Sequence, residues 1–260
     1  MNRIRQAFAD HTALIPFLTA GDPNLEKTAE YIAVLEKAGA DIIEIGIPFS
    51  DPIAEGPVIQ AADTRSLANG TSVKDIFALV RKVRQTSSIP LVLMTYANPV
   101  FYYGYDAFFE EAAKAGADGI IIPDMPLEER EEAAVPAAKQ GITMISMAAP
   151  NSDSRLQAIA SGAEGFVYAV SSAGVTGMRD TITTDIQQFT ASIRRYTETP
   201  VAVGFGIHTP EQAKEIGRYA DGVIVGSGIV QIIAEHGTEA AEPLFQYVSS
   251  LRAALDEIEK

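Results

Sequence analysis

Short runs of apolar residues recur along the whole chain, and segments with a helical spacing of apolar residues separate them. The runs are continuous rather than alternating and are rich in isoleucine and valine, which is typical of strands in a parallel sheet covered on both faces. We predict eight buried strands, at Leu14–Thr19, Asp41–Ile47, Leu91–Ala97, Gly119–Pro123, Thr143–Ala148, Phe166–Ser171, Val201–Phe205 and Val223–Gly226.

The intervening segments have the patterns of amphipathic helices. A helix is expected after Thr209, because Pro210 suits the first helical position and Gln212 can complete a capping box. Near the C-terminus one apolar stripe recurs every three or four residues, at Leu244, Val248, Leu251, Leu255 and Ile258. Strands and helices therefore alternate along the chain.

A weak internal repeat precedes every second predicted strand. It reads Ala38-Gly39-Ala40-Asp41, Ala115-Gly116-Ala117-Asp118, Ser161-Gly162-Ala163-Glu164 and Ala220-Asp221-Gly222. In the first three copies we expect the glycine to end a helix in the left-handed conformation. Eight βα units with right-handed crossovers close into an α/β fold of the (β/α)8 TIM barrel type, and 260 residues fit a single barrel domain. A doubly wound open sheet is the alternative.

The charge balance narrows the classes of partner. The formal net charge is −14, and an acidic surface repels nucleic acids and anionic lipids, so we expect neither nucleic acid nor membrane as a partner. No apolar run approaches the roughly 20 residues that span a bilayer, and the polar segment 1–11 lacks a signal region, so we expect a cytoplasmic protein. Cysteine is absent, and no metal site is predicted.

Glu44 is the first candidate for catalysis. Strand alternation puts Glu44 on the face opposite Ile43 and Ile45, and the isoleucine face should meet the helices. Glu44 then points into the barrel near the C-terminal end of its strand, where burial favours the protonated carboxyl. Such a group can give and take protons near neutral pH. The alternative is a core glutamate paired with a cation, but the interior positions offer no evident basic partner.

Glu55 lies in a long loop that follows the second predicted strand. The loop from Pro48 to Pro57 contains three prolines, which indicates an ordered loop rather than a simple turn. In a barrel such a loop lies on the catalytic face, and Glu55 could swing over a substrate there. Its position alone also fits a solvated side chain.

Glycines at three strand ends predict a site for a small phosphorylated substrate. Gly174 to Gly177, Gly204 to Ile207 and Gly226 to Ile229 follow the last three predicted strands. Barrels bind phosphate on the loops after strands seven and eight, with a helix N-terminus aimed at the anion, and Ser227 can add a hydroxyl there. The alternative is that glycine only relieves crowding. The 174–180 segment could be a hinged lid or a static loop.

The segment Glu44-Ile-Gly-Ile-Pro48-Phe-Ser-Asp51-Pro-Ile-Ala-Glu55-Gly-Pro57 resembles the signature of the tryptophan synthase alpha subunit family. The resemblance extends to every predicted strand end. It continues through the blocks Pro16 to Pro23, Tyr96 to Pro99, Pro123 to Pro126, Tyr168 to Gly177, Val203 to Ile207 and Val225 to Gly228.

This resemblance implies a lyase that cleaves indole-3-glycerol phosphate to indole and glyceraldehyde 3-phosphate by a retro-aldol reaction. Glu44 matches the residue that protonates indole C3 and removes the glycerol hydroxyl proton. Glu55 matches the residue that holds the indole N–H, which is an aspartate in the family. The longer side chain is a departure, because a misplacement of about 1 Å can cost on the order of a hundredfold in rate.

The resemblance also implies binding residues and a partner. Matches around the substrate are Phe17, Ile59, Tyr96, Tyr168, Thr176, Gly177, Gly204, Gly206, Gly226 and Ser227. The family pairs with a tryptophan synthase beta subunit in an alpha2beta2 heterotetramer. The loop with Pro48, Asp51 and Pro52 would face that beta subunit. No cofactor is expected in this chain, and pyridoxal phosphate is expected only in the beta partner.

Two other functions remain open from the sequence, besides a different phosphate-binding barrel enzyme. One is a stand-alone indole-3-glycerol-phosphate lyase that releases indole without a partner. The other is a regulatory subunit that activates the beta chain and has impaired lyase activity because Glu55 replaces the aspartate. A covalent aldolase is disfavoured, because the predicted strands contain no lysine for a Schiff base.

Overall fold

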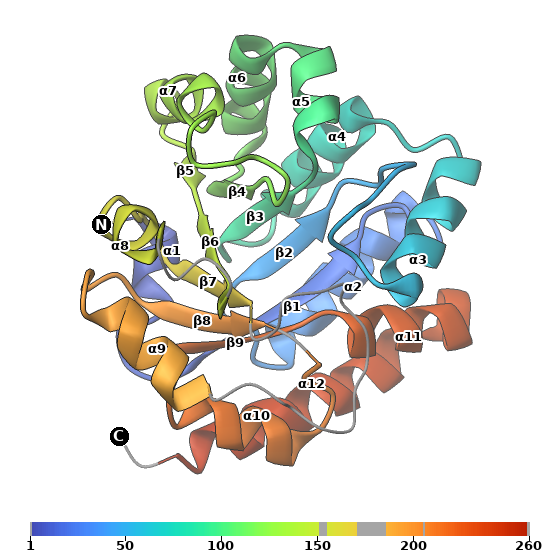
Figure 1. Cartoon of the computed structure of the whole chain (residues 1–260). Helices are drawn as coiled ribbons and strands as arrows, with labels where there is room; N and C mark the ends of the chain where they lie inside the picture. Colours follow the sequence, from blue (N-terminus) through green and yellow to red (C-terminus); the bar gives the residue numbers. More distant parts are fainter. Residues whose placement is uncertain (1, 151–154, 171–185, 205, 259–260) are drawn as a thin grey trace.

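A computed structural model describes residues 2–150, 155–170, 186–204 and 206–258. In this part of the chain, parallel strands form the centre of the molecule and helices surround them (Figure 1). The strands are β1 (Ala13–Thr19), β2 (Ile43–Gly46), β3 (Leu91–Met94), β4 (Gly119–Ile121), β5 (Thr143–Met144), β6 (Ser146–Ala148), β7 (Val167–Val170), β8 (Val201–Gly204) and β9 (Gly222–Val225).

Helices connect the strands, and some connections contain two. The α-helices are α1 (Arg3–Gln6), α2 (Leu25–Lys37), α3 (Pro57–Ala68), α4 (Val73–Val83), α5 (Ala97–Tyr103), α6 (Tyr105–Ala115), α7 (Glu131–Lys139), α8 (Leu156–Ser161), α9 (Ile186–Arg194), α10 (Pro210–Gly217), α11 (Ser227–His236) and α12 (Ala241–Asp256). A 3-10 turn, η2 (Gly237–Glu239), joins α11 to α12. None of these helices is long and apolar enough to cross a membrane.

The strand order β5-β4-β3-β2-β1-β9-β8-β7-β6 confirms the (β/α)8 barrel. The prediction of one uninterrupted strand at Thr143–Ala148 was wrong, because this segment contains both β5 and β6. Thr143 and Met144 pair with β4, whereas Ser146 to Ala148 pair with β7. The neighbouring strand thus changes from β4 to β7 at Ile145, and the two pairings together close the ring of strands.

The barrel has an inner and an outer apolar core. Ile43, Ile45 and Ile47 belong to the outer core between strands and helices. Ile42 belongs to the inner core, which also contains Phe17. The predicted alternation along this segment is therefore confirmed, and it directs Glu44 inward.

The internal repeat forms a series of clamps at the N-terminal end of the barrel. Asp41, Asp118 and Asp221 each accept a hydrogen bond of 2.8 Å from the backbone N–H that opens the preceding strand, at Leu14, Leu91 and Val201 respectively. Each aspartate also pairs with an arginine: Asp41 with Arg252 at 3.3 Å, Asp118 with Arg84 at 2.6 Å and Asp221 with Arg194 at 3.0 Å.

The glycines of the repeat differ in conformation. Gly39 and Gly116 have φ values of 101° and 97°, as predicted for left-handed helix ends. The same prediction for Gly162 was wrong, because its φ is −98°. The chain turns instead at Gly165, with φ of 66°, where a Cβ would lie 2.9 Å from the Ile145 side chain.

The two predicted helix features are present. Thr209 and Gln212 form a reciprocal capping box at the start of α10. The C-terminal helix α12 buries Leu244, Val248, Leu251 and Leu255 and packs against α10 and α2. These contacts seat the last helix against the barrel.

Candidate active site

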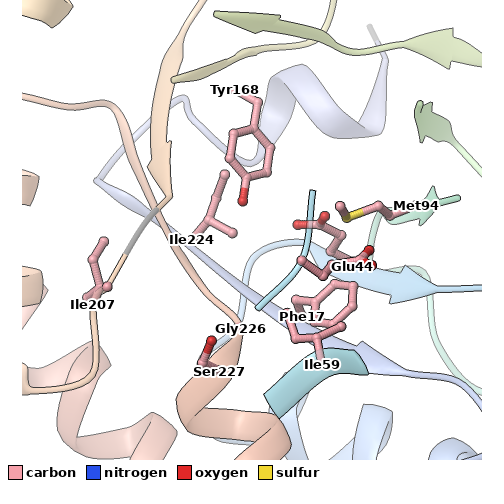
Figure 2. Close-up of a pocket in the computed structure, with 11 residues that line it drawn as sticks. Phe17, Glu44, Ile59, Met94, Tyr168, Ile207, Ile224, Gly226 and Ser227 are labelled. Carbon is pink, nitrogen blue, oxygen red and sulfur yellow. The ribbon is translucent and has the colours of Figure 1, made fainter. Parts of the chain in front are cut away.

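A pocket opens at the C-terminal ends of the strands (Figure 2). It encloses about 510 Å³ including its open mouth, which is a size suited to a small metabolite. The residues that line it are Phe17, Glu44, Glu55, Ile59, Met94, Tyr168, Gly206, Ile207, Ile224, Gly226 and Ser227. The wall is mostly apolar, with two carboxyl groups on one side and the start of α11 on the other.

Glu44 is 1% exposed and projects from β2 into this pocket. Among the described residues, neither oxygen of its carboxyl has a hydrogen-bond partner. Burial raises the pKa of Glu44 to about 8, and the nearby charge of Glu55 adds to the rise. Glu44 is therefore a protonated carboxyl at neutral pH that can still release its proton.

Phe17 supplies much of the apolar cover over Glu44. The two residues are register partners on β1 and β2. A Cβ on Gly46 would lie 2.6 Å from the Phe17 ring, so only glycine allows the ring to approach β2 this closely. In Figure 2 the Phe17 ring lies beside Glu44, while the Tyr168 ring points into the same space from β7.

Glu55 is buried in the pocket wall just before α3, so its side chain is not solvated as a loop position alone allowed. Burial raises the pKa of Glu55 to about 7, although a hydrogen bond from the Tyr96 hydroxyl lowers it. The Tyr96 oxygen also accepts a hydrogen bond of 2.9 Å from the Ala54 N–H. Tyr96 thus fixes the loop and the carboxyl of Glu55 together.

The opposite side of the pocket has the features of an anion site. Gly206, with φ of 63°, and Gly226 bring backbone to the pocket surface, and α11 begins at Ser227. Gly226 has no side chain to cap the helix, so its first N–H groups remain available to an anion. The loop after β8 is anchored by the Tyr247 hydroxyl, which donates to the His208 carbonyl at 3.0 Å.

The structure brings together most of the residues singled out from the sequence. Tyr96 contacts Glu55 from behind the pocket wall. Gly204 lies beneath Tyr168, where a Cβ would come within 2.6 Å of the phenol oxygen. Thr176 and Gly177 lie outside the described residues, and so does the predicted 174–180 lid.

The loop expected to face a partner has an exposed and a buried part. Asp51 is exposed and Pro52 is half-buried, whereas Pro48 is buried within this chain. Large apolar side chains nearby are open to solvent: Ile53 on the same loop, and Phe101 and Tyr102 on α5. Tyr102 is 92% exposed, which is unusual for so large a side chain.

Four residues around the site were not predicted. Ile207 lines the pocket after β8. Met94 and Ile224 line it from β3 and β9, and the inward parity of these strands could have identified them. Asp63 is a buried aspartate on α3, behind Glu55. Asp63 lies four residues after Ile59 and three before Ser66, and this helical spacing could have predicted that Asp63 shares their buried face.

Comparisons with known proteins agree with this geometry. The family model described as tryptophan synthase alpha chain matches residues 5–258. A tryptophan synthase alpha chain of Lactiplantibacillus plantarum is 48% identical over 257 residues, covering 98% of this chain and 97% of the relative. The Lacticaseibacillus casei relative is 44% identical over 256 residues, which is 98% of this chain and 96% of the relative.

Solved structures match over nearly the whole chain. Tryptophan synthase subunit alpha from Legionella pneumophila has a TM-score of 0.89 and 37% identity, covering 99% of this chain and 100% of that one. A chain of the tryptophan synthase complex from Pyrococcus furiosus has a TM-score of 0.85 and 39% identity, covering 94% and 98%.

Proposed function

The chain belongs to the tryptophan synthase alpha chain family, and on that premise we propose that it cleaves indole-3-glycerol phosphate to indole and glyceraldehyde 3-phosphate. The observation that carries this proposal is the layout of the pocket. Two buried carboxyl groups, Glu44 and Glu55, lie at one side of an apolar cavity, and a helix N-terminus with two glycines lies at the other. The apolar side with the carboxyl groups suits the indole ring of the substrate, and the helix N-terminus suits its phosphate.

Glu44 is assigned the proton transfers. Its raised pKa leaves it protonated at neutral pH, so it can donate a proton to indole C3. The bond between C3 and the glycerol carbon then breaks, and its electron pair returns to the ring. The glycerol hydroxyl loses its proton to the Glu44 carboxylate and becomes the aldehyde. Glu44 ends the cycle protonated, as it began.

Glu55 is assigned the ring nitrogen. Protonation at C3 places positive charge on the indole N–H, and a carboxylate that accepts this N–H stabilises the charge. The Tyr96 hydroxyl favours the ionised form of Glu55, which the role requires. The side chain is one methylene longer than the aspartate of the family pattern, and it nevertheless lines the pocket directly.

The remaining pocket residues are assigned to binding. Phe17, Ile59 and Tyr168 form apolar walls for the indole and glycerol part. Backbone groups at Gly206, Gly226 and Ser227 hold the phosphate. Gly204 has no side chain, which leaves space for the Tyr168 ring. Thr176 and Gly177 are proposed to cover the bound substrate.

We further propose that the chain acts in the cytoplasm with a tryptophan synthase beta subunit, in an alpha2beta2 assembly. One related structure from Pyrococcus furiosus is described as such an a2b2 complex. The side chains of Asp51 and Ile53, on the loop that ends in Glu55, are exposed, and so is Tyr102 on α5; we propose that they face that partner. This chain needs no cofactor for the cleavage, and pyridoxal phosphate belongs to the beta subunit.

Indole release from indole-3-glycerol phosphate tests the proposed function, measured with and without a tryptophan synthase beta subunit. We expect slow turnover alone and faster turnover with the beta subunit. Glu44→Gln should lose at least about a hundredfold in kcat, since an amide cannot exchange the proton. Glu110→Gln, on the exposed surface of α6, is the matched control and should keep full activity.

Three results would count against the proposal. Unchanged turnover in Glu44→Gln would remove the mechanism assigned to Glu44. Activation of the beta subunit with no cleavage by the wild-type chain would favour a regulatory subunit. Equal and high turnover with and without the beta subunit would favour a stand-alone lyase.

A further inference from the structure

Asp63 is a buried acid that the proposed mechanism does not use. It projects from α3 and is 4% exposed, yet it does not line the pocket. In the described part of the chain no cation pairs with it. Arg65, its neighbour on α3, instead binds Asp22 through two hydrogen bonds of 2.9 and 2.7 Å. Burying a carboxyl without an ion pair costs folding free energy, so this position calls for an explanation.

The contacts of Asp63 tie α3 to two strand ends. The Thr19 hydroxyl, at the end of β1, donates to Asp63 at a distance of 3.4 Å. The backbone N–H of Phe49, in the loop after β2, also donates to the Asp63 carboxyl. Asp63 therefore holds the first residues of the loop that ends in Glu55.

The path from Phe49 leads back to Glu55. The Phe49 ring packs on Tyr96, with ring centroids 5.3 Å apart. The Tyr96 hydroxyl binds the Ala54 N–H and the Glu55 carboxyl. From α3 itself, the Gln60 side chain donates to the Glu55 carbonyl at 2.8 Å. The loop is thus held at both ends by α3 and in its middle by Tyr96.

Charges around the two acids come from several elements. Glu55 faces Glu44 on β2, Asp63 on α3, Tyr96 after β3, Asp124 after β4 and Tyr168 on β7.

Asp63 itself faces Glu55, Asp22 and Tyr96. Burial raises the pKa of Asp63 to about 8, and the charge of Glu55 adds to the rise. The two carboxyl groups therefore disfavour each other's ionisation.

We propose that Asp63 is a positioning residue for Glu55, which holds the Glu55 loop through Phe49 and faces the Glu55 carboxyl from α3. This inference rests on the proposed function, because Glu55 needs a fixed position and a negative charge only if it meets a developing cation. It assigns to α3 a task in catalysis beyond covering the barrel.

Two substitutions separate the contacts of Asp63 from its charge. Asp63→Asn keeps an oxygen that can accept from Phe49 and Thr19, so its kcat at neutral pH should stay within about threefold of wild type. Asp63→Ala releases the loop, and kcat should fall by about tenfold to a hundredfold with KM nearly unchanged. The matched control is Asp118→Asn, another buried aspartate, at the opposite end of the barrel.

The pH dependence gives a readout that a merely structural role would not move. Activity requires ionised Glu55, so kcat of the wild type should fall as pH drops through about 7. Asp63→Asn removes a neighbouring acid, which lowers the pKa of Glu55 and moves this acid limb to lower pH. Asp118→Asn should lower the melting temperature and leave the limb in place.

A measurement without substrate separates this inference from the proposed function. Titration of the Glu55 carboxyl carbon by 13C NMR should show a lower midpoint in Asp63→Asn than in wild type and no change in Asp118→Asn. If the wild type releases no indole, the proposed function fails, and the NMR midpoint still decides whether Asp63 acts on Glu55. Wild-type kcat in Asp63→Ala, or an unmoved Glu55 midpoint in Asp63→Asn, would overturn the inference.

Discussion

The burial of Glu44, Glu55 and Asp63 serves the proposed site but lowers the stability of the folded chain. Each has a pKa raised above that of the same residue in an unfolded chain, and burial is the main cause for all three. These three groups therefore bind more protons in the folded than in the unfolded chain between roughly pH 4.5 and 8. Their contribution to the free energy of unfolding should fall as pH rises through this window.

Glu44→Gln tests how much the burial of one carboxyl group costs in stability. An amide has no charge to desolvate, so the variant should be more stable than wild type by a few kcal/mol near pH 8.5, and by much less near pH 4.5. Urea unfolding at the two pH values measures the difference. An equal stability difference at both pH values would mean that Glu44 does not hold its proton in the folded chain.

At the scale of elements, the start of α11 and the first half of α12 act together. Tyr247 on α12 is half-buried and donates to the His208 carbonyl, and a Cβ on Gly228 would lie 2.4 Å from the Tyr247 oxygen. The absence of a side chain at Gly228 thus lets Tyr247 pass the helix start and reach the loop after β8. The C-terminal helix anchors the proposed phosphate end in this way.

Tyr247→Phe is expected to weaken phosphate binding without changing the chemistry. Loss of one hydrogen bond to the His208 carbonyl should raise KM for indole-3-glycerol phosphate by about fivefold and leave kcat unaltered. Steady-state kinetics and calorimetric titration with glycerol 3-phosphate both report it. Tyr219→Phe, at a half-exposed position beyond α10, serves as the control. A fall in kcat with constant KM would contradict this assignment.

At the scale of the whole molecule, the two ends of the barrel divide stability from chemistry. The aspartate and arginine clamps lie at the N-terminal ends of the strands, and the pocket lies at the C-terminal ends. Barrels commonly show this division, because loops that follow the strands can vary while the opposite end holds the strands in register.

Asp118→Asn measures how much one aspartate–arginine clamp contributes to the free energy of unfolding. Asp118 and Arg84 are both largely buried, and loss of the charge leaves Arg84 without its partner, so the free energy of unfolding should fall by about 3 kcal/mol. Glu110→Gln breaks an exposed pair with Lys114 and should change it by less than about 1 kcal/mol. Denaturant unfolding compares the two. An equal effect of both would show that the clamp adds nothing beyond a surface pair.

Local pattern was sufficient for much of this protein. The period of side chains along a strand is a property of the backbone, so the sequence alone directed Glu44 inward and Ile43 outward. Glycine permits a positive φ and proline fixes φ at a helical value, so Gly39, Gly116 and the cap at Thr209 were also predictable. The succession of such units implied the barrel. That the whole chain is one domain stays a prediction.

Tertiary structure decided what depends on contacts between distant segments. The break at Ile145 follows from a change of neighbour between β4 and β7, which no local pattern records. The burial of Glu55 depends on Tyr96, which lies 41 residues further along the chain but beside it in the fold. Asp63 makes its contacts with Thr19 and Phe49 only when α3 packs against β1 and the loop after β2. The sequence determined the direction of each side chain, and packing determined its neighbours, because a pKa depends on surroundings that only the closed barrel supplies.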